Sequence, residues 1–126
     1  MRVLVDTNAF LMPGQFGIDL FSELERLFGA CDIRTVGEVA AELEGIARGR
    51  GRDAAAARLG LALLPRCTVE EAGPGRAGAD ARLAGVAERD GSIVVTNDRG
   101  LREALLARGI AVVSMRGKKR LELIRG

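Results

Sequence analysis

Residues 90–98 read DGSIVVTND, and Ile93 to Thr96 within them is the most strand-like run of the chain. β-Branched residues favour extended backbone, and the Asp-Gly pair before the run is a turn signal. A similar short apolar run, Val3 to Val5, opens the chain and stops at Asp6. These two runs predict two strands, each followed directly by polar residues.

Helical segments separate these strands from the others that the pattern predicts. The predicted helices cover residues 19–28, 37–47, 53–64, 79–89 and 98–108, and the other predicted strands cover 31–36, 67–71 and 110–114. The resulting order is β, α, β, α, α, β, α, β, α, β. Because each crossover must return the chain to the same end of the sheet, this order predicts an α/β fold with a parallel sheet covered on both faces.

Length and composition predict one globular unit. With 126 residues, of which 48% are hydrophobic and 29% charged, the chain can bury one sizeable core but not two. We therefore treat residues 1–126 as a single domain that ends in a basic segment at 115–126. No apolar run approaches the ~18 residues that cross a bilayer, and the N-terminus does not resemble a signal peptide. We expect no membrane partner and a cytoplasmic location.

The inventory of reactive side chains limits the chemistry. The chain has no histidine, so imidazole can serve neither as a general base nor as a metal ligand. Its two cysteines, Cys31 and Cys67, lack the spacing of a zinc or redox motif and are expected to be buried thiols. Carboxylates, hydroxyls, amides and lysines remain as the groups that could carry a reaction.

Basic residues form two clusters, although the net charge is only +2. One cluster brackets a Gly-rich turn and the other lies near the C-terminus: Arg48, Arg50, Arg52 and Arg58, and Arg116, Lys118, Lys119 and Arg120. A charged loop and a solvated terminal helix explain these clusters as well as nucleic-acid binding does. Without Trp or Tyr, the chain would have to hold single-stranded RNA mainly through its phosphates.

Two acids are expected to meet at one edge of the sheet. Asp6 follows the first predicted strand and Asp98 follows the fourth, and ligands of open parallel sheets gather at the carboxyl ends of the strands. A strand order of 3-2-1-4-5 would make these two strands neighbours. Two carboxylates at close range raise each other's pKa unless a cation lies between them, and a hard divalent metal suits that place.

Each acidic candidate also has a purely structural interpretation. Asp6 could begin a turn, Asp98 could be a helix N-cap, and Asp80 could be placed against a helix dipole. Their converging positions in the topology favour a shared site. One predicted helix contains three further candidates: Glu38, Glu42 and Glu44. Spacing alone does not choose among them.

Four strings of the sequence resemble the acidic motifs of PIN-domain nucleases. They occur in the family's order and at its usual intervals: VLVDTNAFL at 3–11, AAELEGIARGRGRD at 40–53, GADARLAG at 78–85 and IVVTNDRGLREAL at 93–105. The resemblance implies a three-layer α/β/α fold with a central parallel sheet of about five strands in the order 3-2-1-4-5. The chain is most similar to archaeal relatives of the PIN nucleases that process pre-ribosomal RNA, and also to the toxin ribonucleases of toxin–antitoxin pairs.

Carried over by position, the resemblance implies which residues form the site. The acids implied as catalytic and metal-binding are Asp6, Glu42, Asp80 and Asp98. The polar residues implied as their supports are Thr7, Asn8, Thr96 and Asn97. The residues expected to bind RNA phosphates are Arg48, Arg50, Arg52, Arg116, Lys118 and Lys119. Glu38 stays the alternative to Glu42.

The activity that the resemblance implies is that of a Mg²⁺- or Mn²⁺-dependent endoribonuclease, in which the metal activates water for in-line attack on a phosphodiester. The implied role is rRNA processing or RNA turnover. A toxin ribonuclease and a non-catalytic RNA-binding subunit are the alternatives. The expected partners are RNA, a second copy of the chain, and an antitoxin or a ribosome-assembly protein.

Two other classes of protein with acidic pockets fit the sequence less well. A receiver-like signalling domain would need paired acids after the first strand, where this chain has Asp6 and Thr7, and an Asp near Thr68 to Glu71, where it has none. A phosphatase with an aspartyl nucleophile would need a second Asp two residues after the first, where this chain has Asn8. The sequence therefore favours the nuclease.

Overall fold

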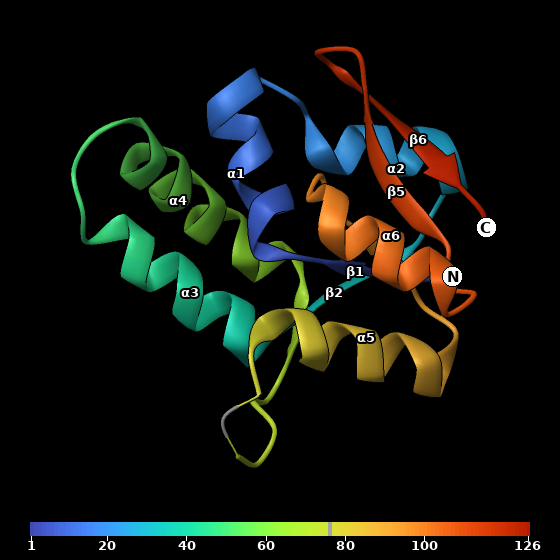
Figure 1. The fold of residues 1–126 in the computed structure, drawn as a ribbon. Coiled ribbons are helices and arrows are strands. Elements are labelled where there is room, and N and C mark those ends of the chain that lie inside the picture. The colour runs from blue at the N-terminus through green and yellow to red at the C-terminus, as the bar shows by residue number, and fades with distance from the viewer. Residues whose placement is uncertain (76) are drawn as a thin grey trace.

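The computed structural model describes residues 1–75 and 77–126, and a six-stranded sheet forms its centre (Figure 1). The strands are β1 (Arg2–Val5), β2 (Asp32–Val36), β3 (Thr68–Glu70), β4 (Ile93–Val95), β5 (Val112–Arg116) and β6 (Arg120–Ile124). They are ordered β3-β2-β1-β4-β5-β6; the first five pair in parallel, and β6 runs antiparallel to β5. The predicted α/β class and the order of the first five strands are confirmed, and a sixth strand is added.

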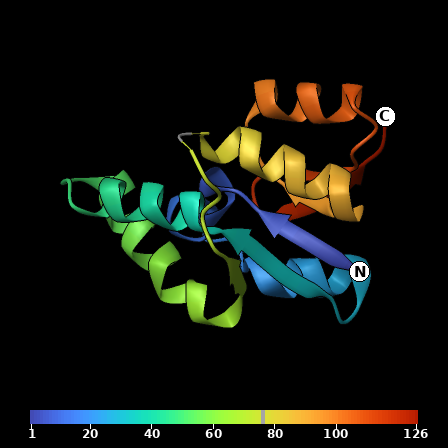
Figure 2. The ribbon, with the colours of Figure 1, turned by 90° about the horizontal axis from the view of Figure 1, so that it is seen from below.

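Helices cover both faces of the sheet and extend beyond its carboxyl edge. They are α1 (Thr7–Phe16), α2 (Leu20–Phe28), α3 (Gly37–Ala47), α4 (Arg52–Leu63), α5 (Ala79–Asp90) and α6 (Arg99–Ala107), with a short 3-10 helix at Leu64–Arg66. Figure 2 shows α5 and α6 on one face of the sheet and α2 on the other, while α3 and α4 project past the end of β2. None of the helices in the described part of the chain is long and apolar enough to cross a membrane.

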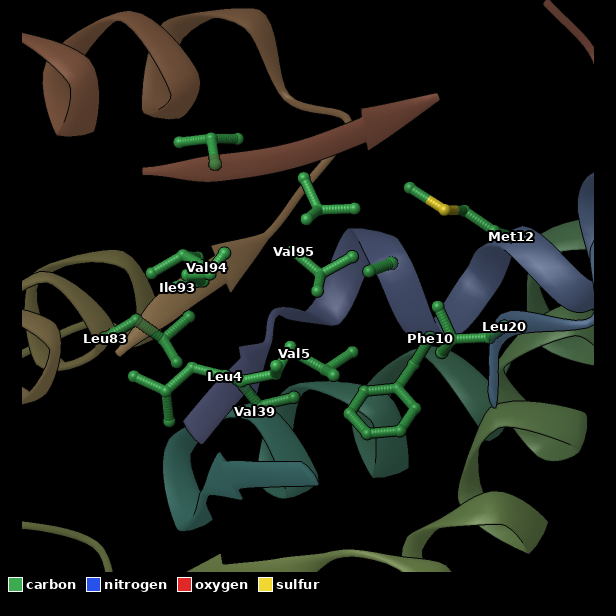
Figure 3. Close-up of a cluster of buried hydrophobic side chains, with 14 of the residues drawn as sticks. Leu4, Val5, Phe10, Met12, Leu20, Val39, Leu83, Ile93, Val94 and Val95 are labelled. Carbon is green, nitrogen blue, oxygen red and sulfur yellow. The ribbon is translucent and has the colours of Figure 1, made fainter. Parts of the chain in front are cut away.

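The core is built on β1 and β4, the two strands that the sequence predicts most clearly. Their apolar side chains are 5% exposed or less. Leu4 pairs with Val94 and Val5 with Val95, and these four side chains lie among buried residues from the flanking helices (Figure 3). Full burial of a side chain of this size contributes roughly 1.5–3 kcal/mol. The residues that follow β1 and β4 therefore start from well-fixed backbone.

Residues 7–16 form a helix, which is absent from the predicted helices; Asp6 begins this helix rather than a turn. The N-cap of α1 is Asp6, whose Oδ1 accepts a hydrogen bond from the Ala9 N–H at 2.6 Å. Pro13 and Gly14 lie inside the helix and hide its pattern, because both residue types normally weaken or end helices. Tertiary packing supports the helix instead, since a Cβ on Gly14 would lie only 2.6 Å from the backbone of α4.

The basic segment 115–126 forms a hairpin with β5, so a solvated terminal helix is the wrong interpretation of this segment. Leu121 in β6 is buried, and α2 binds its backbone on the side away from β5. Glu23 accepts a hydrogen bond from the Leu121 N–H at 2.9 Å, and Arg26 donates one to the Leu121 carbonyl at 2.7 Å. These contacts satisfy the N–H and carbonyl of Leu121 at the open edge of the strand, which a sequence pattern cannot show.

The close packing of α4 on α1 can be tested at Gly60, where a Cβ would lie 2.7 Å from the Phe10 carbonyl oxygen. We expect Gly60→Ala to lower the free energy of unfolding by about 1–3 kcal/mol, because the two helices would have to separate. Gly45 in α3 is the matched control, since nothing lies within 4 Å of its added Cβ. Gly45→Ala should raise the free energy of unfolding by roughly 0.5–1 kcal/mol through helix propensity. Urea unfolding measures both, and equal stabilities of the two variants would contradict the packing described.

Candidate active site

The four predicted acids line one cavity of about 420 Å³ at the carboxyl edge of the sheet. Each acid comes from a different segment: the end of β1, the middle of α3, the first turn of α5 and the start of α6. The residues around the cavity are Asp6, Thr7, Asn8, Leu11, Glu42, Ile46, Gly78, Ala79, Asp80 and Asp98. The fold thus brings together side chains that are up to 92 residues apart, from Asp6 to Asp98.

Asp6 is the deepest of the four acids, with 3% of the residue exposed. Its backbone N–H donates to the Val95 carbonyl at 3.1 Å, and its side chain caps α1. Burial raises the pKa of the Asp6 carboxyl to about 7. Hydrogen bonds from the Thr96 hydroxyl and the Ala9 N–H oppose this rise, while the nearby carboxylates add to it. The charged form of Asp6 therefore lacks sufficient compensation from the protein alone.

Asp98 is fixed by the start of α6. Its Oδ1 accepts a hydrogen bond from the Leu101 N–H at 2.9 Å, so the N-cap interpretation describes its structural role correctly. Its own N–H donates to the Thr96 hydroxyl at 3.0 Å. Among the described residues, the buried Thr96 and the half-buried Asn97 lie beside the cavity lining without belonging to it. The structure therefore places Thr96 as a support for two acids and gives Asn97 no comparable contact in the described chain.

The structure separates Glu42 from the other glutamates of α3. Glu42 lines the cavity, and its Oε2 accepts a hydrogen bond from the Thr7 hydroxyl at 3.1 Å. Glu38 instead accepts a hydrogen bond from the Gly73 N–H at 3.0 Å and faces Arg82. Glu44 is exposed. The geometry thus supports Glu42 over the alternatives that spacing left open.

Asp80 lies in the first turn of α5, two residues after the N-cap Gly78. Partial burial raises the pKa of its carboxyl, and the charge of Asp98 raises it further. The same charge also raises the pKa of Asp6. Negative charge is thus concentrated around the cavity, and a cation bound there would offset the cost of ionising Asp6 and Asp80.

The donor set fits a hard divalent cation in its chemistry. Carboxylate, hydroxyl and amide oxygens are the ligands that Mg²⁺ and Mn²⁺ prefer, and the histidine common in zinc and copper sites is absent from the sequence. With the side chains as they stand, no three acids or cysteines in the described chain converge closely enough to hold one ion. The three acids nearer to solvent would therefore have to turn toward Asp6 when a cation binds.

The basic residues lie outside the cavity. Arg48 and Arg50 are exposed in the connection from α3 to α4, and Arg52 is exposed at the first position of α4; this part of the chain projects past the carboxyl edge of the sheet (Figure 1). Arg116, Lys118 and Lys119 are exposed where β5 turns into β6. Because β5 is parallel to β1, its end at Arg116 lies at the same edge as Asp6. Arg58 has a structural role, because its guanidinium donates a hydrogen bond to the Ala47 carbonyl at 2.6 Å and so caps the C-terminus of α3.

The apolar side of the cavity was not predicted from the sequence. Leu11 and Ile46 contribute to it, together with Gly78 and Ala79. Leu11 follows Thr7 by four residues on α1, and Ile46 follows Glu42 by four on α3. Residues at this spacing share a helix face, so the pattern could have found Ile46, whereas Leu11 required knowledge of the unexpected helix α1.

Comparison with known proteins assigns the family. The sequence model of the family described as "PIN like domain" matches residues 3–118. Ribonuclease VapC9 of Archaeoglobus fulgidus is 33% identical over 119 residues, which cover 94% of this chain and 85% of that protein. The chain therefore belongs to the PIN-like domain family, as its motifs predicted.

Solved structures share the fold over nearly the whole chain. The structure of the PIN domain endonuclease Utp24 has a TM-score of 0.81 at 26% identity, and covers 99% of this chain and 92% of that one. The crystal structure of VapBC2 from Rickettsia felis, bound to a DNA fragment from its promoter, has a TM-score of 0.67 at 15% identity. The match covers 92% of this chain and 100% of that one. The second likeness shows the fold alone. With the first and with the ribonuclease relative, the chain is placed among the PIN-domain nucleases.

Burial of Asp6 predicts how the stability of the metal-free protein depends on pH. The unfolded carboxyl ionises near its ordinary pKa of 3.8, whereas the folded one ionises near 7. Between these values the folded state holds a proton that the unfolded state has lost, so stability falls as the pH rises. In EDTA we expect the free energy of unfolding to decrease by roughly 1–3 kcal/mol from pH 5 to pH 8. Urea unfolding at each pH measures this change.

Asp6→Asn keeps an acceptor for the Ala9 N–H and should flatten this pH dependence. Asp19 is the matched control, because it also caps a helix but is exposed and its pKa is lowered by bonds from Ser22. Asp19→Asn should leave the slope between pH 5 and pH 8 unchanged. A wild-type protein whose stability is constant or rises over this range would contradict the burial of the Asp6 charge.

Proposed function

We propose that this protein is a Mg²⁺- or Mn²⁺-dependent endoribonuclease that hydrolyses RNA phosphodiester bonds at the cavity around Asp6. The observation that carries the proposal is the meeting of four acids from four separate segments around one cavity, with the pKa of the buried one raised to about 7. Such an arrangement is unfavourable without a cation and well suited to one. The nuclease relatives support the same reaction class.

The residues of the chain differ in what they contribute to the proposed reaction. Asp6 is fixed by the Ala9 N–H and by burial, so it supplies the most rigid oxygen ligand. Thr7 orients Glu42 through the hydroxyl–carboxylate bond. Asp80 and Asp98, at the starts of α5 and α6, would complete the ligand set. Asn8 would bind a water molecule beside the cation. A divalent cation bound here activates water and stabilises the charge on the leaving oxygen, so no histidine is required.

The exposed basic residues are proposed to hold the RNA on both sides of the cut. The set is Arg48, Arg50, Arg52, Arg116, Lys118 and Lys119. Contacts of this kind are made to phosphates, do not depend on the RNA sequence, and weaken as salt is added. In this proposal residues 1–126 act as one nuclease domain.

Two finer roles would use the same cavity. The motif resemblance implies either processing of ribosomal RNA or RNA cleavage by a toxin of a toxin–antitoxin pair. The likeness to the Utp24 endonuclease and to Ribonuclease VapC9 supports the nuclease activity that both roles share. The partner would be a ribosome-assembly protein in the first case and an antitoxin in the second, and a homodimer is compatible with both. A small antitoxin gene beside this one would favour the second role.

The reaction can be tested with a set of single-stranded and structured RNAs in Mn²⁺, Mg²⁺ or EDTA. We expect cleavage that requires metal and that falls on the order of 100-fold or more in an Asp6→Asn, Asp98→Asn double variant, because two metal ligands are lost. Asparagine can keep both helix caps, so the variant should stay folded. Asp19→Asn is the matched control and should cut as the wild type does. Failure of the wild type to cut any RNA with metal would favour a non-catalytic RNA-binding subunit.

A further inference from the structure

Glu38 and Arg82 join three segments of the chain beside the candidate active site. The Oε2 of Glu38 accepts a hydrogen bond from the Gly73 N–H at 3.0 Å and lies 3.6 Å from the Nε of Arg82. Arg82 also donates from Nη2 to the Glu71 carbonyl at 3.0 Å. The helix α3, the loop after β3 and the helix α5 are therefore connected through one ion pair.

This ion pair is largely shielded from water. The side chains of Glu38 and Arg82 are 15% and 23% exposed. The backbone around them is also tightly fitted, since a Cβ on Gly37 would lie 2.8 Å from the Ala72 nitrogen and one on Gly73 would lie 3.2 Å from the Arg82 Nε. Charges this shielded interact more strongly than surface pairs do, and loss of one partner leaves the other uncompensated.

The same two helices carry two of the acids. Glu38 precedes Glu42 by one turn of α3, and Arg82 follows Asp80 by two residues in the first turns of α5. A shift of α5 relative to α3 would therefore change both the Glu38–Arg82 contact and the separation of Glu42 and Asp80 across the cavity. The ion pair is placed to set this separation.

Asp80 depends on such a contact more than the other acids do. Asp6 and Asp98 fix themselves by capping their helices, and Glu42 is bound by the Thr7 hydroxyl. In contrast, α5 begins at Gly78 without a side-chain cap among the described residues. The contact from Arg82 to Glu38 and to the loop is then the polar link that holds the first turns of α5 against α3.

We propose that Glu38 and Arg82 are positioning residues, which hold Asp80 at the correct distance from Glu42 for a divalent cation to bind between them. This inference rests on the proposed metal-dependent function. It also gives Glu38 a role that differs from that of a metal ligand. Loss of the ion pair should weaken cation binding without removing any ligand.

The test compares Glu38→Gln and Arg82→Gln with Glu88→Gln. Glu88 lies eight residues after Asp80, near the other end of α5, and pairs with Arg108 at 2.6 Å, so its substitution removes a different ion pair of the same helix. Binding of Mn²⁺ is measured by titration, and exchange of the Gly73 amide hydrogen is measured in EDTA by NMR. We expect Glu38→Gln and Arg82→Gln to weaken Mn²⁺ binding on the order of tenfold and to accelerate Gly73 exchange, whereas Glu88→Gln does neither. Arg82→Lys should recover part of the Mn²⁺ affinity.

RNA cleavage at increasing Mn²⁺ concentration separates positioning from ligation. Glu38→Gln should need more Mn²⁺ but approach the wild-type rate at saturation, whereas Glu42→Gln should not. Wild-type Mn²⁺ affinity in Glu38→Gln would overturn the inference, and so would a rate at saturating Mn²⁺ as low as that of Glu42→Gln. A wild-type protein that binds no Mn²⁺ and cuts no RNA would instead reject the proposed function, and this inference with it.

Discussion

The carboxylate of Asp6 caps α1 from a buried position at the end of β1, and the site is arranged around this contact. The bond from the Ala9 N–H fixes where α1 begins, and the bond to the Val95 carbonyl ties the same residue to β4. One residue therefore links the central strands of the sheet to the first helix. Because its position is fixed by the fold, the other acids only have to reach it from neighbouring segments.

The same burial creates a conflict between stability and charge. A carboxylate with so little exposure is poorly solvated. The charges of Asp80 and Asp98 raise its pKa further, and Glu42 lines the same cavity. The folded, metal-free chain relieves the conflict by holding a proton near neutral pH. A divalent cation would relieve it by replacing that proton. Asp6, the N-cap of α1, would then also be the residue through which metal binding stabilises the fold.

The sequence predicts the parts of the fold that depend on local pattern. The runs at Val3 to Val5 and Ile93 to Thr96 are strand-like in themselves, and the alternation of helices and strands then implies the parallel sheet. The helix α1 could not be predicted because Pro13 contradicts it locally, and the packing on α4 that supports it beside the Asp6 cap is a tertiary contact. The strand β6 could not be predicted because the outward-facing backbone of Leu121 is bound by side chains of α2, about 98 residues away in sequence.

The acids of the site also differ in whether the sequence pattern could place them. Asp6 and Asp98 follow strands, so topology alone places them together. The choice between Glu38 and Glu42 depends on which partner each glutamate meets in space, Gly73 in one case and Thr7 in the other. No spacing rule contains that information. Only the family resemblance pointed to Glu42 before the three-dimensional arrangement was known.

Proton release on metal binding tests the central claim most directly. If a cation replaces the proton of Asp6, calorimetric titration with Mn²⁺ in buffers of different ionisation enthalpy should detect about one proton released per ion at pH 6, because the folded pKa is about 7. The number should fall toward zero at pH 8.5, and it should be lost in Asp6→Asn. Binding of Mn²⁺ without proton release at pH 6, or with the same release in Asp6→Asn, would contradict the account.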